Sequence, residues 1–177
     1  SGYYMKKNPF GKKGDFITSP NISVLFSEMI AIWVVSFWQN LGCPKEFNLI
    51  ELGAGNGEMM KVLVNTFDKF PIFKNSCHIK ILERSKLLKK KQKASINKKN
   101  IQWLNGLSQL NNLPCIFLAN EFFDALPIKQ FIKKEKKWFE RHVRFFNNKF
   151  EYFDVPFDMK KFENKIKFKI AKQQNFI

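Results

Sequence analysis

The sequence predicts a protein of the α/β class, with helices on both faces of a parallel sheet and antiparallel aromatic-rich strands near the C-terminus. Three observations lead to this prediction. Short apolar segments alternate with helical segments between residues 47 and 119, which is typical of a parallel sheet. A glycine-rich loop directly follows the first apolar segment. After residue 127, aromatic-rich segments are separated by short charged or Asn-Asn turns, as in antiparallel hairpins.

A long apolar helix is expected before the sheet. Ser19 is a suitable N-cap, and Pro20 suits the first helical position. Residues 22–41 are mostly apolar, and Gly42 with Pro44 would end the helix. We expect this helix to pack against the sheet.

The alternating part of the chain predicts the elements of the parallel sheet in order. Its strands are expected at residues 47–52, 78–83, 101–104 and 115–119. Its helices are expected at residues 57–70 and 85–97, followed by a short helical turn within 121–126. The aromatic-rich part predicts strands at residues 128–132, 138–146 and 150–154 and an amphipathic helix over 159–173.

The composition limits the classes of function. The 31 Lys and Arg against 15 Asp and Glu give a net charge of +16, which can suit nucleic acid, a membrane or an acidic partner. The lysines are scattered, with one dense cluster at 86–93, so a solvated surface is the better interpretation. Three cysteines without C-x-x-C spacing and two isolated histidines predict no metal site. The most apolar run, 30–38, is too short to span a bilayer, and no signal peptide is visible.

The glycine-rich loop predicts a cofactor. Gly53, Gly55 and Gly57 follow a buried strand, at the edge where open α/β sheets bind ligands. Glu58 stands after the third glycine, so the spacing is G-x-G-x-G and not the G-x-G-x-x-G of dinucleotide sites. A carboxylate in the first turn of the helix would also repel a phosphate. S-adenosylmethionine (SAM), which has no phosphate, fits better.

Two acidic residues complete the predicted SAM site. Glu51 ends the first strand and can accept hydrogen bonds from the methionine ammonium. Glu83 ends the second strand, where its carboxylate can hold both ribose hydroxyls. A strand-end acid together with the glycine loop favours this role over that of a surface glutamate.

The segment ANEFFDALP begins as the fourth strand ends, so it opens onto the same edge of the sheet. Asn120, Glu121 and Asp124 can orient a nitrogen nucleophile toward the methyl group. Phe122 and Phe123 either exclude water from the site or simply pack in the core. The segment therefore supplies the predicted catalytic residues.

Three segments carry a family resemblance. GYYMKKNPFGKKGDFITSPNIS, NLIELGAGNG and ANEFFDALPIKQF, in that order, closely resemble the MidA-like SAM-dependent methyltransferases, the family that includes the mitochondrial complex I assembly factor. The resemblance implies a class I methyltransferase (Rossmann-like) fold, SAM as cofactor, and protein arginine N-methylation in support of respiratory complex I assembly. It also implies that GDFITSP lies over the cofactor, which makes Asp15, Thr18 and Ser19 candidate binding residues.

Arginine methylation suits the predicted catalytic segment. A guanidinium stays protonated up to a pKa above about 12, so carboxylates must bind its fork and take up a proton as the methyl transfers. Glu121 and Asp124 are expected to do this, with Asn120 beside them. The transfer would be an in-line displacement without a covalent intermediate.

The resemblance implies a single methyltransferase domain over residues 1–177, and we expect it to be incomplete. Residues 1–19 would form a loop over the cofactor, 20–127 the SAM-binding core, and 128–177 antiparallel strands and a tail. The family's chain is longer, which together with the opening Ser1-Gly2 predicts an amino-terminal portion.

Three residues depart from the family pattern. Ala54, Asn56 and Asn21 stand where family members usually carry Pro, Arg and an acidic residue. The fold should tolerate these changes, and Ala54 is kept among the cofactor-binding residues.

Two other functions stay open. A non-catalytic assembly protein with a SAM fold is favoured by the missing carboxyl-terminal half. A nucleic-acid methyltransferase is favoured by the charge and by Asn120, but it ranks third because the Pro-Pro-aromatic sequence common after such a residue is absent. The expected partner is a protein substrate such as a complex I subunit, in the bacterial cytoplasm or, in a eukaryote, the mitochondrial matrix.

Overall fold

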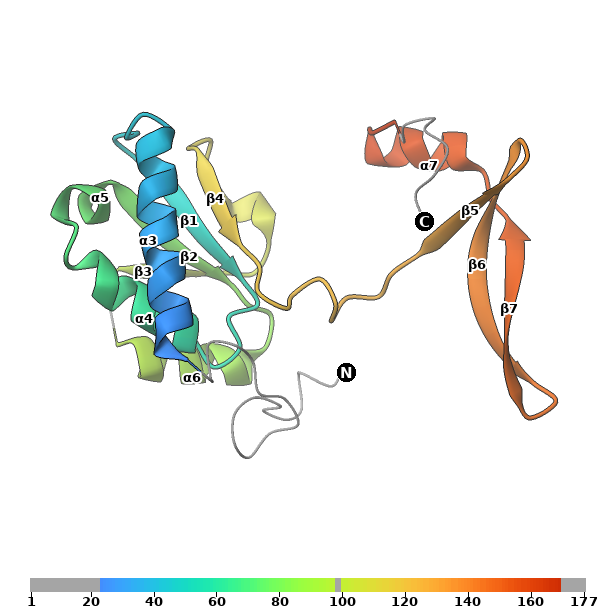
Figure 1. Cartoon of the computed structure of the whole chain (residues 1–177), viewed down its shortest axis with the longest axis horizontal. Helices are drawn as coiled ribbons and strands as arrows, with labels where there is room; N and C mark the ends of the chain where they lie inside the picture. Colours follow the sequence, from blue (N-terminus) through green and yellow to red (C-terminus); the bar gives the residue numbers. More distant parts are fainter. Residues whose placement is uncertain (1–22, 98–99, 170–177) are drawn as a thin grey trace. The chain divides into compact units, whose positions relative to one another are not determined.

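The computed structural model describes residues 23–97 and 100–169 of the chain. The chain divides into two compact units, Ser1–Ala125 and Leu126–Ile177 (Figure 1). The first unit holds the parallel sheet and the second holds the antiparallel one, so the predicted α/β class with a parallel and an antiparallel sheet is confirmed. The sequence predicted helices on both faces of the parallel sheet, whereas the described α-helices that form the core with its strands lie on one face.

The first unit is built on a four-stranded parallel sheet with the order β3-β2-β1-β4. Its strands are β1 (Phe47–Leu52), β2 (Cys77–Leu82), β3 (Ile101–Leu104) and β4 (Cys115–Leu118). All four predicted strands are confirmed to within one residue at each end. Strand β1 has a strand on either side and all six of its residues are buried, and its carboxyl end lies beside those of β2 and β4.

The helices of this unit differ from the predictions at two places. They are α3 (Val24–Asn40), α4 (Glu58–Phe67), α5 (Pro71–Ser76), α6 (Lys86–Ile96) and the short 3-10 helix η1 (Leu107–Gln109). The helix predicted over 57–70 ends early, because Pro71 has no N–H to donate to the Phe67 carbonyl and instead begins α5. The helical turn predicted within 121–126 was wrong: these residues form turns, and Glu121 has a φ of 47°, outside the right-handed helical region.

Helix α3 starts with Ser23 at its N-cap position. Ser19 and Pro20, where the sequence predicted the start, lie outside the described residues. The predicted stop is confirmed: Gly42 adopts a φ of 81°, and its N–H donates to the carbonyl of Gln39 over 2.9 Å.

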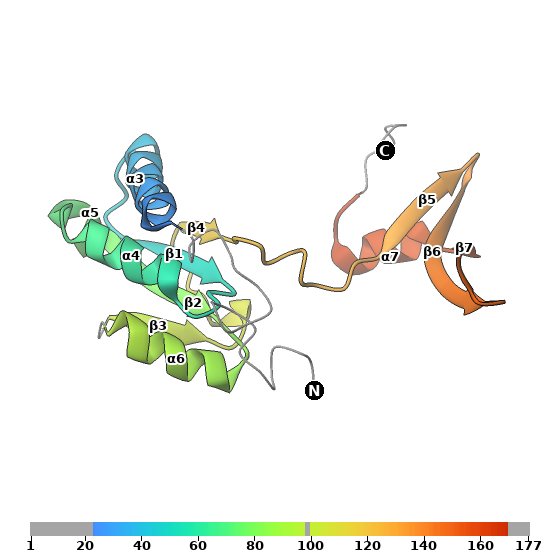
Figure 2. The same ribbon diagram turned by 60° about the horizontal axis from the view of Figure 1, so that its bottom comes forward.

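One hydrophobic core lies between the sheet and the helices. Helices α3, α4 and α6 lie side by side along one face of the sheet (Figures 1 and 2). The helices contribute Ala31, Val34, Leu63, Val64, Phe67 and Ile96, and the strands contribute Phe47, Leu49, Ile81, Ile101, Ile116 and Leu118. The expected packing of the first helix against the sheet is therefore confirmed.

In its described residues, 126–169, the second unit is a three-stranded antiparallel sheet with the order β5-β6-β7, followed by one helix. Its elements are β5 (Gln130–Lys134), β6 (Lys137–Phe146), β7 (Lys149–Pro156) and α7 (Met159–Ile166). The Asn-Asn turn is confirmed, because Asn147 and Asn148 have φ angles of 49° and 58° between β6 and β7. The helix predicted over 159–173 ends earlier, at Ile166, since Lys167 adopts a left-handed φ of 54°. Residues 170–173 lie outside the described part.

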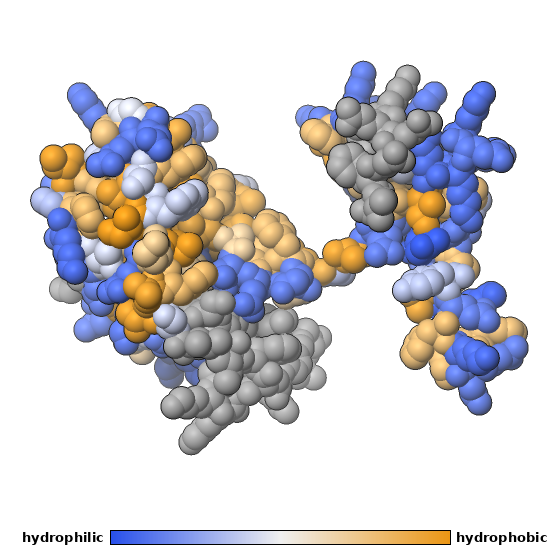
Figure 3. Space-filling view, in the orientation of Figure 1, coloured by the Kyte–Doolittle hydropathy of each residue, from blue (hydrophilic) through white to orange (hydrophobic). Residues whose placement is uncertain are grey.

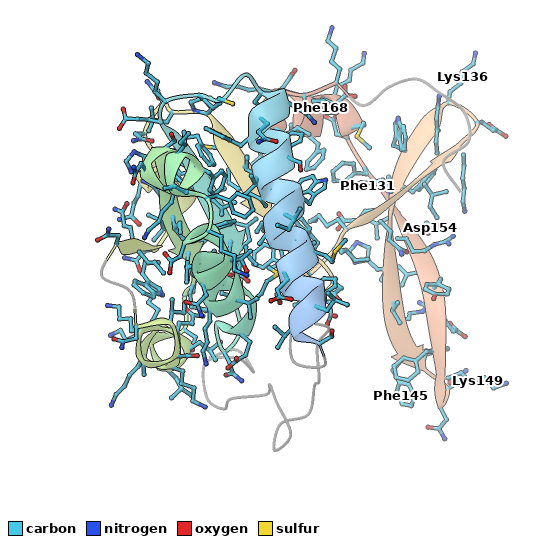
Figure 4. All side chains as sticks on the ribbon, turned by 60° about the vertical axis from the view of Figure 1, so that its left-hand side comes forward. Phe131, Lys136, Phe145, Lys149, Asp154 and Phe168 are labelled. Carbon is cyan, nitrogen blue, oxygen red and sulfur yellow. The ribbon has the colours of Figure 1, made fainter. Side chains whose placement is uncertain are left out.

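The second unit buries little of its surface. Phe162 of α7 packs against Phe131 of β5, with ring centroids 5.3 Å apart. Asp154, labelled in Figure 4, lies toward the carboxyl end of β7 and pairs with Lys134 and Arg141 on the sheet. Among the described residues of this unit, only Met159 is a buried hydrophobic residue.

The outer face of α3 is apolar. Leu25, Met29, Trp33 and Phe37 are exposed on it, and the rings of Trp33 and Phe37 stack with centroids 5.2 Å apart. Figure 3 shows apolar side chains gathered over this helix. Within 23–97 and 100–169, no helix is long and apolar enough to cross a membrane.

Candidate cofactor site

The glycine-rich loop joins β1 to α4 through three left-handed residues. Gly53, Gly55 and Gly57 have φ angles of 68°, 54° and 85°, which glycine adopts without the steric cost that other residues meet. The Gly57 N–H donates to the Ala54 carbonyl over 2.7 Å, which closes the turn, and Gly57 then caps α4. The N–H of Gly53 donates to the Leu82 carbonyl over 3.0 Å, so the loop starts as a continuation of the sheet.

Glu51 is a buried acid at the entry to this loop. Its side chain is only 3% exposed, and its Oε2 atom has no hydrogen-bond partner among the described residues. Burial without a compensating charge raises the pKa of Glu51 from 4.5 to about 8. A buried carboxylate oxygen without a partner is costly, so this position is suited to a ligand that carries a donor or a positive charge.

Glu83 follows the last residue of β2 and is also buried. Its Oε1 accepts a hydrogen bond of 2.8 Å from the N–H of Ser85, which is the N-cap of α6. Its Oε2 accepts one of 3.2 Å from Nε2 of Gln92. Glu51 pairs with Ile81 across the β1–β2 register, and this brings both strand-end acids to the same edge of the sheet.

Sequence reasoning missed Gln92. This side chain is 0% exposed on α6, where it donates to Glu83 and, over 2.9 Å, to the Gly55 carbonyl. A signal was present: Leu88, Gln92 and Ile96 are the buried residues of α6, spaced four apart, and Gln92 is the polar member of that buried face.

The segment after β4 lies against the glycine loop. A Cβ added at Gly53 would come within 2.6 Å of Cδ2 of Phe122, so that ring packs directly on the loop. Phe123 contacts Phe122 edge-to-face but is 64% exposed. Glu121 is exposed and holds a left-handed φ of 47°, a conformation that is unusual outside glycine and clusters at functional sites.

The remaining predicted site residues are placed as follows. Asn120 is half-buried directly after β4, and Asp124 is exposed in the turn that follows. Asp15, Thr18 and Ser19 lie outside the described residues. A hollow of about 670 Å³ lies at the amino ends of β2 and β3, away from the glycine loop, and none of the predicted site residues lines it. The described residues hold no group of three His, Cys, Asp or Glu side chains that could bind a metal ion.

A glycine loop after the first strand of a 3-2-1-4 parallel sheet, with acids at the ends of β1 and β2, is the arrangement of the class I SAM-dependent methyltransferase fold. Residues 29–176 match the family described as "Putative S-adenosyl-L-methionine-dependent methyltransferase". The chain belongs to this family, the MidA-like SAM-dependent methyltransferases, whose cofactor is SAM.

Several relatives carry the name protein arginine methyltransferase NDUFAF7, mitochondrial, or its homolog. The chain is 35% identical over 166 residues to the Caenorhabditis elegans protein, 32% over 161 to that of Drosophila melanogaster and 31% over 166 to the human one. These matches cover 79–80% of this chain but only 37–38% of the relatives. The chain thus spans less than half of their length.

The fold also matches a solved structure from Burkholderia thailandensis, a COG1565 superfamily member bound to S-adenosyl-homocysteine. The TM-score is 0.63 at 22% identity, over 90% of this chain and 42% of that protein. This likeness shows that the two chains share the fold.

Proposed function

We propose that the protein is a SAM-dependent protein arginine N-methyltransferase that supports the assembly of respiratory complex I. One observation carries the proposal: the buried Glu51 carboxyl, whose Oε2 has no partner among the described residues, lies at the edge of the sheet where Phe122 packs on the glycine loop. Phe122 belongs to the acidic segment after β4. The names of the NDUFAF7 relatives support the arginine substrate.

The residues at the sheet edge fit SAM. Glu51 would bind the methionine ammonium, because that group supplies the charge and the donors that Oε2 lacks. Glu83 would accept hydrogen bonds from the ribose hydroxyls with the lone pairs that Ser85 and Gln92 leave free. The glycines, with Ala54 between them, would let the backbone approach the cofactor closely.

SAM supplies an electrophilic methyl group on a sulfonium. Glu121 and Asp124 would bind the substrate guanidinium, and Asn120 would orient it. As an arginine nitrogen forms its bond to the methyl carbon, the carbon–sulfur bond breaks and the proton of that nitrogen passes to a carboxylate. Phe122 would help to exclude water from the reacting groups.

The layout of residues 1–177, as part of a single methyltransferase domain, belongs to the proposal. Residues 1–19 would cover the cofactor through Asp15, Thr18 and Ser19, residues 20–127 would form the SAM-binding core, and residues 128–177 would add the antiparallel strands. In a bacterium the protein would act in the cytoplasm, and in a eukaryote it would act in the mitochondrial matrix; the names of the relatives support a mitochondrial location. The substrate would be a complex I subunit.

A non-catalytic assembly protein is the second candidate. The exposed apolar face of α3 and the weakly buried second unit favour it, because both leave apolar surface available to a protein partner. A nucleic-acid methyltransferase ranks third, since Asn120 is followed by Glu121 and not by Pro-Pro.

Two measurements separate the arginine methyltransferase from the assembly protein. Calorimetry on the full-length protein should show binding of S-adenosylhomocysteine that is weakened by Glu83→Ala, and no binding by the unmodified protein would end the enzyme proposal. Mass spectrometry of complex I subunits from cells with and without the gene should show a lost arginine methylation. Binding that depends on Glu83, with an unchanged methylation pattern, would favour the assembly protein.

A further inference from the structure

We infer that Gln92 is a positioning residue for the cofactor: it holds the glycine loop and the Glu83 carboxylate in one fixed relation. The inference rests on the proposed role of Glu83 in binding the ribose. It adds a residue from α6, a helix that sequence reasoning treated as a lysine-rich surface element.

The amide of Gln92 bridges the two parts of the site. Its Nε2 donates to the Gly55 carbonyl over 2.9 Å and to Oε2 of Glu83 over 3.2 Å. An amide nitrogen has two hydrogens, so both donors are used. Because the side chain is fully buried, water cannot replace either bond. The bridge thus links the backbone of the loop to the acid at the end of β2.

Trp103 of β3 sets the orientation of this amide. Its Nε1 donates to Oε1 of Gln92 over 2.9 Å. An indole N–H can only donate, so the atom that faces it must be the amide oxygen, and the nitrogen is left to face the loop and Glu83. The Lys93 ammonium lies 5.2 Å from the centre of the Trp103 ring, over the indole face.

The stem of Gln92 also packs on the loop. A Cβ added at Gly57 would lie 3.3 Å from Cγ and 3.4 Å from Cα of Gln92. The residue therefore touches the third glycine and bonds the carbonyl of the second. Methionine has the same length and a flexible stem but no donor, so Gln92→Met removes the bridge while it keeps most of the packing.

The inference is tested by S-adenosylhomocysteine binding to the full-length protein, measured calorimetrically in a double-mutant cycle. Gln92→Met should weaken binding about tenfold in the wild-type background. In a Glu83→Ala background it should weaken binding only about threefold or less, because the carboxylate that Gln92 positions is already absent. Gln102→Met is the matched control, since Gln102 bonds Lys80 on the neighbouring strand and should leave the affinity unchanged.

Wild-type affinity in Gln92→Met, or an equal loss in both backgrounds, would overturn the inference. If Gln92→Met does not fold, Trp103→Phe gives the same test, because it keeps Gln92 and removes the bond that orients it. A loss of twofold to fivefold that disappears in the Glu83→Ala background is then expected, and no loss would overturn the inference. A Glu83→Ala protein that binds normally would instead reject the role of Glu83 itself.

Discussion

Phe122 lies so close to Gly53 that a Cβ at the glycine would come within 2.6 Å of the ring's Cδ2. The contact joins the segment after β4 to the loop after β1, two strands that are neighbours in the sheet. It therefore explains how residues about 70 positions apart in the sequence come to share one edge of the sheet.

Gly53→Ala should destabilise the protein by about 1–3 kcal/mol, because it adds a clash with Phe122 to a backbone held at a φ of 68°. Urea unfolding measures the loss. Gly106→Ala is the control, since the nearest atom to its new Cβ would be 3.8 Å away and its φ of −166° is extended. Equal stability of the two variants would contradict the proposed clash.

Ligand affinity should depend on the protonation of Glu51. With a pKa of about 8, the carboxyl is mostly protonated at pH 7, whereas the ammonium of the ligand requires the carboxylate. Binding of S-adenosylhomocysteine should therefore tighten about tenfold from pH 6 to pH 7, release a proton, and level off above about pH 8. Calorimetry in buffers of different ionisation enthalpy counts the proton. A Glu51→Gln variant should bind weakly with no such dependence; the same slope in that variant would exclude Glu51 as its source.

The stability of the protein without ligand should also depend on the protonation of Glu51, but it should fall as the pH rises, whereas ligand affinity should increase. Glu51 keeps its proton in the folded protein up to a pKa of about 8, whereas the unfolded chain releases it near 4.5. The folded state thus binds more protons between these values, and its free energy of unfolding should fall by about 1.4 kcal/mol per pH unit as the pH rises through this range. Denaturant unfolding measures the free energy of unfolding of wild type and Glu51→Gln at each pH, and the difference between them gives the contribution of Glu51. The same pH dependence in both proteins would contradict this contribution.

Cysteine reactivity should separate two thiols of the first unit. Burial raises the pKa of Cys77 to about 12, and Cys43 is exposed. Because the thiolate is the reactive form, iodoacetamide at pH 8 should modify Cys43 and leave Cys77 until denaturant is added. Peptide mapping by mass spectrometry checks this, and equal labelling of both cysteines would contradict the raised pKa of the partly buried Cys77.

Glu121→Gln and Asp124→Asn should each reduce methyl transfer about 100-fold or more, because they remove a group proposed to accept the substrate proton. Both should leave S-adenosylhomocysteine affinity unchanged. Arginine methylation of complex I subunits, in cells that produce each variant, measures the transfer. Glu135→Gln is a matched control, since Glu135 is also exposed and has a left-handed φ of 53°. Full transfer by both variants would remove them from the proposed mechanism.

Local sequence patterns determined the elements and much of the candidate site. The four parallel strands, the glycine loop and the Asn147-Asn148 turn could be predicted because each depends on a local pattern. Apolar segments mark the strands, and glycine and asparagine adopt the left-handed backbone conformation that the loop and the turn require. The same holds for Glu51 and Glu83, since an acid at the end of a strand can be recognised in its own segment. The helical turn expected within 121–126 failed because the left-handed Glu121 is not visible in a local pattern.

Tertiary structure decided which of these groups act on one another. Gln92 lies on a lysine-rich helix, and only the packing of α6 beside the loop shows that its amide bridges Gly55 and Glu83. The raised pKa of Glu51 likewise follows from its burial, which only the folded structure shows. Hydrogen bonding and desolvation are set by what surrounds a group in space, so the sequence determined the residue types and the fold determined their chemistry.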